Sequence, residues 1–458
     1  MTDAVVRPIA ALARDLAEGR TTSRRLVEEA LARIADASGE GGRAFTKVSA
    51  QGALAAAEAS DRQRKEGVVP SPLAGLPVSI KDLFDIAGEV TTAGSTILRD
   101  RPPAAADAGA VARLRGAGAV VIGRSNMTEF AFSGIGINPH YGTPANPYDR
   151  GSRRIPGGSS SGAAVSVADG MAAFALATDT GGSVRIPAAL CGVAGFKPTA
   201  VRVPREGAFP LSTTLDSVGP IAPTVGCCAT VFQVLAGEAV RPLVPAALSA
   251  TRLGVPENYM LEDLDVEVME AFQSAVQRLS RRGARIVDIA VPEFDEAARA
   301  NAGGGISPPE AYAVHRKWIE RDREIDPRVL ERILRGGLVT APDYIELLAT
   351  RALLMKRFAL HRNHVDAMLM PSVPRIAPRI DGLERNPEGF RLANGNMLRN
   401  TNLINFLDGC ALTLPIHPPR TAPVGLMVVG FNGEDERVLS VGLALETALA
   451  YQGPVLVE

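Results

Sequence analysis

The stretch GGSSSGAAVSVADGMAAFALATDTGGSVRIPAALCGVAGFKP, residues 157–198, decides the fold of this chain. It holds two clusters of glycine and serine, at 157–162 and 181–183, with small and apolar residues between them. A flexible Gly/Ser linker is polar throughout, whereas this spacer contains Phe174 and Leu176, which can be buried. Two interpretations follow. The clusters are either tight turns around a core helix and strand, or a nucleophile site where glycines let backbone N–H groups approach a reacting atom beside a serine.

Three separated pieces of the sequence resemble the signature of the amidase signature enzymes. They read Gly157-Gly158-Ser159-Ser160-Ser161-Gly162, then Asp179-Thr180-Gly181-Gly182-Ser183-Val184-Arg185-Ile186-Pro187, and far upstream Leu76-Pro77-Val78-Ser79-Ile80-Lys81-Asp82. Weaker similarity continues over most of the chain. Ser161 stands where many members carry glycine, which leaves the expected catalytic positions unchanged but could alter the shape of the loop.

The resemblance implies an α/β class, the amidase signature fold, in which helices cover both faces of a large mixed, mostly parallel β-sheet. We expect a single amidase domain over residues 1–458, because no proline- or serine-rich linker divides the chain. Its expected parts are an N-terminal helical part (1–65), a catalytic core with the signature (66–235), and the remainder of the sheet with the substrate-pocket helices (236–458).

Hydrophobic periodicity outside the signature predicts alternating helices and strands. Residues 23–34 predict a helix with Thr22 or Ser23 as its N-cap. Strands expected at 252–256 and 284–289 flank a helix expected at 265–281, and this β-α-β order favours a parallel sheet. Further elements are expected as a helix at 49–66, a strand within 73–86, a helix then strand within 108–123, helices over 296–363, strands at 365–370 and 424–429, and a helix at 435–449.

Amide hydrolysis needs a nucleophile, a base and donors for the oxyanion. None of the five histidines lies in the glycine and serine core, so a Ser-His-Asp triad fits poorly. A neutral lysine can act as the base. Lowering a lysine pKa from about 10.4 to roughly 7.5 takes about 4 kcal/mol of environment, which a buried site can supply.

The resemblance assigns roles to the residues of these motifs. Ser183 is the implied nucleophile, Ser159 bridges it to Lys81, and Lys81 draws protons through that bridge; the peptide bond before Ser159 is cis in the family. The implied oxyanion hole consists of the backbone N–H groups of Thr180, Gly181, Gly182 and Ser183. The implied supporting residues are Asp179 and Arg185, which hold the loop by charged hydrogen bonds, and Ser160, which either orients the network or stabilises the loop.

A long turn-rich segment at 123–149 is expected to border the substrate pocket, because long ordered loops often line sites. By resemblance, its wall residues are Met127, Phe130, Phe132 and Ser133. The alternative is that these side chains only cover the core.

Charge and cysteine usage exclude several classes of protein. The net charge is −1, from 49 Lys and Arg against 50 Asp and Glu, so no global field would gather nucleic acid or an anionic membrane. Four cysteines without C-x-x-C pairs or nearby histidines predict no metal site. No secretory signal or run of about eighteen apolar residues is present. We therefore expect a cytoplasmic enzyme without cofactor or metal.

The leading hypothesis is an amidase, a hydrolase of linear amide C–N bonds that converts a small or medium carboxamide to a carboxylate and ammonia or an amine through an acyl-enzyme. One alternative is the glutamine-hydrolysing component of a tRNA-dependent amidotransferase, which would need partner chains. Another is a non-enzymatic binding protein on an amidase scaffold. A small-molecule amide is the expected partner, nucleic acid and membrane are not, and a homodimer is the default oligomer.

Overall fold

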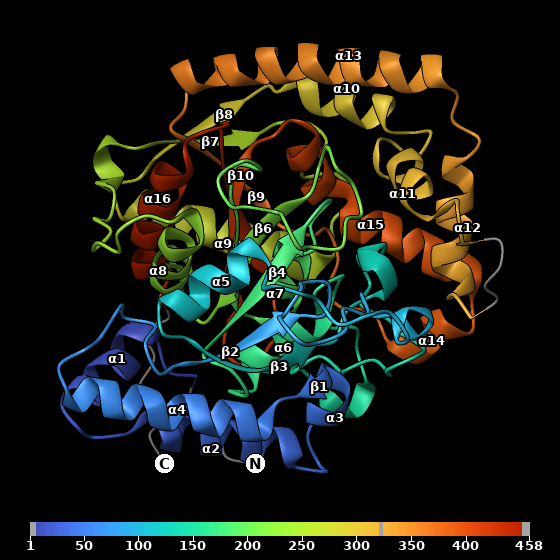
Figure 1. Cartoon of the computed structure of the whole chain (residues 1–458). Coiled ribbons are helices and arrows are strands. Elements are labelled where there is room, and N and C mark those ends of the chain that lie inside the picture. Colours follow the sequence, from blue (N-terminus) through green and yellow to red (C-terminus); the bar gives the residue numbers. More distant parts are fainter. Residues whose placement is uncertain (1–5, 320–323, 451–458) are drawn as a thin grey trace.

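One mixed β-sheet of eleven strands forms the centre of the protein (Figure 1). The computed structural model describes residues 6–319 and 324–450. In chain order the strands are β1 (Phe45–Val48), β2 (Pro77–Lys81), β3 (Val120–Ser125), β4 (Phe174–Asp179), β5 (Ala194–Lys197), β6 (Ser217–Ala222), β7 (Arg252–Pro256), β8 (Arg285–Ile289), β9 (Ala367–Pro371), β10 (Cys410–Pro415) and β11 (Gly425–Gly430). Across the sheet they lie in the order β1-β3-β2-β4-β6-β5-β10-β11-β9-β7-β8. All three expected parts of the chain contribute strands to this one sheet.

The strand directions correct one detail of the expected fold. Among the described residues, four pairings are parallel, namely β2 with β3 and β4, and β7 with β8 and β9. Six are antiparallel, including every pairing from β4 through β6, β5, β10 and β11 to β9. The sheet is therefore mixed, as expected, but not mostly parallel. Short apolar strands buried on both faces do not encode their direction, so only the β-α-β segments were recognisable.

Helices cover both faces of the sheet, as expected for this α/β class. They are α1 (Ile9–Ala17), α2 (Ser23–Ala35), α3 (Gly41–Ala44), α4 (Ala50–Lys65), α5 (Gly109–Gly116), α6 (Ser161–Ala168), α7 (Arg185–Cys191), α8 (Val225–Ala236), α9 (Val266–Arg281), α10 (Pro292–Ala300), α11 (Ser307–His315), α12 (Pro327–Gly336), α13 (Ala341–Phe358), α14 (Ile380–Glu384), α15 (Pro387–Phe406) and α16 (Asp435–Leu449). Figure 1 shows α1, α2 and α4 at one end of the sheet, and α10 and α13 at the other.

Strand β4 shows how the two faces form separate cores. Phe174 and Leu176 pack into the larger hydrophobic cluster, whereas Ala175 and Ala177 pack into a second cluster with helices α2, α4 and α6. This alternation follows from the two-residue period of a strand. Small residues on the second face let α6 approach the strand closely, and α6 begins at Ser161, within the first glycine and serine cluster.

Most of the elements expected from periodicity are confirmed within one to four residues. Helix α2 begins at Ser23, and the Thr22 side chain caps it by accepting a hydrogen bond from the Arg25 N–H. The segment at 200–224, which lacks a clear pattern in sequence, contains β6 with Pro220 inside it. Proline has no N–H group to donate to a neighbouring strand, so its presence in a segment argues against predicting a strand there.

Side chains of the central strands should contribute much more to the free energy of unfolding than exposed side chains do. Leu412 on β10 is fully buried, and its Leu412→Ala variant is expected to lower the free energy of unfolding by about 2–5 kcal/mol through lost burial and a cavity. Leu353 on α13 is 57% exposed, so Leu353→Ala should change the free energy by less than about 0.5 kcal/mol. Chemical denaturation of both variants measures the difference, and equal midpoints would contradict this assignment of the core.

Candidate active site

The site lies where two neighbouring parallel strands end. Because β2 and β4 are parallel, their carboxyl ends meet at the same edge of the sheet. Lys81 is the last residue of β2, and Thr178 is the last but one of β4. The Lys81 Nζ donates to Ser159 Oγ at 2.7 Å and to Thr178 Oγ1 at 2.9 Å. The lysine predicted from sequence therefore contacts the predicted bridging serine.

Lys81 is fully buried, and burial lowers its pKa from 10.5 to about 7, against the opposing attraction of Asp179 and Asp216. Desolvation disfavours the ammonium form, while nearby carboxylates favour it. The balance leaves a substantial neutral fraction near pH 7. A neutral Nζ has a lone pair that can accept a proton from a hydroxyl, which is the requirement for a general base.

The two predicted catalytic serines, Ser159 and Ser183, lie in the turns that precede α6 and α7. Ser159 follows a cis peptide bond with Gly158, and its hydroxyl faces Lys81. Ser183 is 4% exposed and its Oγ has no hydrogen-bond partner within the described part of the chain. Because Ser183 also lines a small pocket, its hydroxyl is available to a bound molecule.

The turn between β4 and α7 is held by a buried ion pair. The Asp179 carboxylate accepts hydrogen bonds from Arg185 Nε at 3.0 Å and Nη2 at 2.9 Å, and from the N–H groups of Gly182 and Val184. Both charged side chains are fully buried. Although burial would raise the pKa of Asp179, the Arg185 guanidinium holds it well below its usual range. This geometry accords with the supporting role expected for both residues.

The backbone donors of this turn differ in availability. The Gly182 N–H donates to Asp179 Oδ1 at 2.8 Å, so it already has an acceptor. The N–H groups of Thr180, Gly181 and Ser183 have no acceptor among the described residues. Only these three of the four predicted oxyanion donors are therefore free to receive an oxygen. Gly182 has φ of 135°, where a side chain would be strained.

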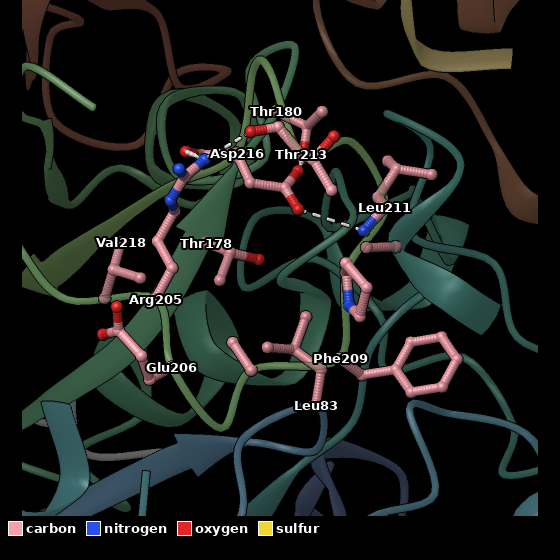
Figure 2. A pocket seen from close by; sticks show the side chains of 13 residues that line it. Leu83, Thr178, Thr180, Arg205, Glu206, Phe209, Leu211, Thr213, Asp216 and Val218 are labelled. Atoms are coloured by element: carbon pink, nitrogen blue, oxygen red, sulfur yellow. Dashed lines mark hydrogen bonds between the residues drawn. The ribbon is translucent and has the colours of Figure 1, made fainter. Parts of the chain in front are cut away.

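A buried carboxylate, which the sequence analysis did not select, fixes Thr180. Asp216 accepts hydrogen bonds from the Thr180 hydroxyl at 2.5 Å and the Leu211 N–H at 3.0 Å (Figure 2). Burial raises the pKa of Asp216 to about 6. These residues line an open pocket that extends to Thr178, with about 750 Å³ of space that includes open solvent. Asp216 thus ties the turn that carries Ser183 to the loop that carries Leu211.

The pocket at Ser183 contains about 310 Å³ of space, part of which is open solvent. Phe132 and Ser133 line it, as predicted from sequence, whereas Met127 and Phe130 do not. Phe130 packs instead against a ring cluster that includes His315 at 4.5 Å between ring centroids, and its φ of 51° turns the chain sharply there. Apart from Ser133 and the turn at residues 180–183, the polar residues of the lining are Ser307, Arg332 and Asn402.

Helix α15 supplies site residues that sequence reasoning missed. Asn405 Nδ2 donates to Asp179 Oδ1 at 2.9 Å, and the Thr401 hydroxyl donates to the Gly181 carbonyl at 2.7 Å. Arg185 Nη2 also donates to the Thr401 carbonyl at 3.0 Å. The sequence held one clue to this role, because Asn394 and Asn405 lie on one face of an amphipathic helix. In the structure both are buried, and buried polar groups need partners.

The two remaining serines of the first cluster bond to backbone. Ser160 Oγ donates to the Thr178 carbonyl at 3.4 Å, which favours the loop-stabilising alternative over a place in the proton network. Ser161, the departure from the usual signature, begins α6 and donates to the Asn126 carbonyl at 3.4 Å. Neither hydroxyl contacts Lys81 or Ser183 in the described structure.

Residues 6–319 and 324–450 hold neither a metal-binding cluster nor a membrane-spanning helix. No group of three or more His, Cys, Asp or Glu side chains in these ranges could hold a metal ion. Within the same ranges, no helix has the length and apolar character needed to cross a bilayer.

Comparisons with known proteins support the resemblance. The model of the Amidase family matches residues 25–439. A 2-amino-5-chloromuconic acid deaminase from Comamonas testosteroni is 37% identical over 409 residues, which is 88% of each chain. The A component of the glutamyl-tRNA(Gln) amidotransferase from Chloroflexus aggregans is 34% identical over 482 residues, covering 97% of both chains. The crystal structure of an amidase is 36% identical with a TM-score of 0.87, covering 97% of this chain and 100% of that chain. The predicted family, its fold and its class, a hydrolase of C–N bonds, are confirmed.

Replacement of Arg185 tests how much the Asp179–Arg185 ion pair contributes to the stability of the fold. In Arg185→Met the buried Asp179 loses its charged partner, and we expect the free energy of unfolding to fall by about 3–5 kcal/mol. Arg241 forms an exposed pair with Glu436 at 2.8 Å, so Arg241→Met should cost no more than about 1 kcal/mol. Denaturant titration compares the two variants. A loss in Arg185→Met as small as that in Arg241→Met would contradict the structural role.

Proposed function

The chain belongs to the amidase family, and we propose that it hydrolyses the C–N bond of a small or medium carboxamide with Ser183 as the nucleophile. The observation that carries the proposal is the contact between buried Lys81 and Ser159 at 2.7 Å, because it gives a serine site a base without histidine. The free hydroxyl of Ser183 in a pocket completes the arrangement.

The proposed reaction proceeds through an acyl-enzyme. Ser183 Oγ attacks the carbonyl carbon while its proton passes to Ser159 and the Ser159 proton passes to neutral Lys81. The tetrahedral intermediate collapses with cleavage of the C–N bond, and the leaving nitrogen takes the proton back from Lys81 through Ser159. Water then attacks the ester with the same base, which releases the carboxylate and restores Ser183.

The intermediate carries a negative oxygen that needs preorganised donors. We assign the N–H groups of Thr180, Gly181 and Ser183 to this role, because each lacks an acceptor among the described residues. Loss of one such donor typically costs about 2.7–4 kcal/mol of transition-state stabilisation. The ion pair of Asp179 and Arg185 holds the turn, so the donors are in place before substrate binds.

The size of the pocket supports a small substrate. The space of about 310 Å³ between its lining atoms includes open solvent, so the enclosed part is smaller than the roughly 300–1,000 Å³ typical of small-molecule sites. Phe132 and Ser133 form the predicted part of the wall. The larger cavity at Asp216 shares Ala131, Thr180 and Leu211 with this pocket, which leaves room for a longer substrate.

The amidotransferase alternative is favoured by one observation, the 34% identity to the glutamyl-tRNA(Gln) amidotransferase chain over 97% of both sequences. In that case the protein would hydrolyse glutamine and act with partner chains. Co-purification with such partners and ammonia release from glutamine alone would support it. The non-enzymatic alternative has less support, because a binding protein would not need a buried lysine whose pKa is lowered to about 7.

A cytoplasmic location is part of the proposal. The four cysteines are buried free thiols, which suits a reducing compartment. A homodimer stays a prediction that rests on the frequency of symmetric dimers among enzymes, and a sedimentation experiment would test it.

Ser183→Ala is expected to abolish amide hydrolysis, with kcat reduced by at least about 10⁴-fold, since loss of a nucleophile removes the covalent route. Ammonia release from a panel of aliphatic, aryl and amino-acid amides measures it. Ser38→Ala, at an exposed serine, is the control and should retain full activity. Equal activity in both variants would refute Ser183 as the nucleophile.

The dependence of kcat/KM on pH should report the protonation state of Lys81. Only the neutral amine accepts a proton, and burial lowers its pKa to about 7, so kcat/KM should rise with pH and level off above about 7. Below that pH, activity should fall about tenfold per unit, because the ammonium fraction grows. Protonation of Asp216, whose pKa is raised to about 6, removes a charge that favours the Lys81 ammonium, so the fall should become shallower below about pH 6. An acid limb centred near pH 4 would contradict the assignment of Lys81 as base.

A further inference from the structure

Arg332 on α12 lines the same pocket as Ser183. Its Nη1 donates to the Phe132 carbonyl at 2.8 Å, and its guanidinium lies over the Phe132 ring, 4.2 Å from the centroid. These two contacts fix the guanidinium against a wall of the pocket. Burial, with a smaller contribution from Arg335, lowers its pKa to about 10, so the group is still charged near pH 7.

Arg332 differs from its neighbours on the same helix. Arg328 pairs with Asp326 at 2.8 Å, and Arg335 pairs with Glu331 at 2.6 Å. No carboxylate within residues 6–319 and 324–450 forms an ion pair with Arg332. Arginine is seldom withdrawn from water without an anionic partner. Arg332 is thus a half-buried cation without a counter-charge among the described residues.

The unused edge of Arg332 is the edge that binds carboxylates elsewhere in this protein. Arg185 holds Asp179 through Nε and Nη2, and Arg328 holds Asp326 through the same two nitrogens. In Arg332 only Nη1 donates to a described residue, so Nε and Nη2 are unused there. This fork matches the two oxygens of a carboxylate.

We propose that the substrate of this pocket is an amide that carries a carboxylate, a monoamide of a dicarboxylic acid, and that Arg332 binds this carboxylate while Ser183 attacks the amide. The inference rests on the proposed amide hydrolysis and specifies its substrate class. The charge pair fixes which end of the molecule faces the nucleophile, so Arg332 sets both specificity and orientation.

The same lining argues against an ammonium group on the substrate. No Asp or Glu among the described residues lines the pocket at Ser183, so a cationic group would lie near Arg332 without a partner. Desolvating an unpaired charge is costly. Glutamine and glutaramate differ only by the α-ammonium group, and we therefore expect glutaramate to be the better substrate of the two.

Steady-state kinetics on matched amides tests the proposal. Succinamate and glutaramate carry the carboxylate, and butyramide and pentanamide replace it with a methyl group. For the wild type, kcat/KM should be about 10- to 100-fold higher for each carboxylate amide than for its neutral match, the range expected for a charged hydrogen-bonded pair. Glutamine should be at least about 10-fold poorer than glutaramate.

Variants of α12 identify the residue responsible. Arg332→Met should reduce the carboxylate-to-neutral ratio at least about 10-fold, and Arg332→Lys, which keeps the charge without the fork, should retain part of it. Arg335→Met removes the exposed arginine one turn along, and should leave the ratio unchanged. A wild type without preference for the carboxylate, or the same ratio in Arg332→Met, would overturn the inference while leaving amide hydrolysis established.

A binding measurement separates this inference from the proposed function. Calorimetry with succinate and glutarate on Ser183→Ala protein needs no turnover. The Kd should rise at least about 10-fold when Arg332→Met is added, and should not change with Arg335→Met. Arg332 also lines a second cleft between α12 and α15. Dicarboxylates that fail to bind, or that inhibit the wild type without competing with substrate, would overturn binding beside Ser183.

Discussion

The active site depends on one contact, the hydrogen bond from buried Lys81 to Ser159. A lysine enclosed by the sheet loses hydration, and this loss lowers its pKa to about 7. The same burial that destabilises the ammonium suits the amine to its proposed role as a base. The parallel pairing of β2 and β4 places Lys81 beside Thr178 near the end of β4, and Ser159, in the turn before α6, accepts a hydrogen bond from the same Nζ.

A second constraint keeps this turn in shape. The buried pair of Asp179 and Arg185 orients the backbone around Gly182, and Asn405 from α15 bonds to the same carboxylate. Segments far apart in the sequence thus converge on one turn. A buried ion pair is not a strong source of stability compared with apolar packing. Its value here is geometric, because it leaves three N–H groups free beside Ser183.

The sequence was informative where chemistry requires particular residue types at fixed spacing. Lys81, Ser159, Ser183 and the Asp179–Arg185 pair could all be proposed from sequence, because the motifs that contain them resemble the amidase signature. Strand direction was less accessible, since strands buried on both faces look alike in either orientation. Contacts between segments that are distant in the sequence could not be predicted. Neither Asp216 nor Arg332 stands in a recognisable pattern, and the roles proposed for them follow only from what the fold places beside Ser183.

The most direct test of the central claim is the pH dependence of covalent labelling of Ser183 by a serine-reactive phosphonate, because it needs no knowledge of the substrate. Mass spectrometry of the labelled peptide identifies the site, and the rate of labelling reports the base. We predict a single label on Ser183 whose rate rises with pH through about 7 and collapses in Lys81→Ala. Labelling at another residue, or a rate on Ser183 unaffected by loss of Lys81, would contradict the claim.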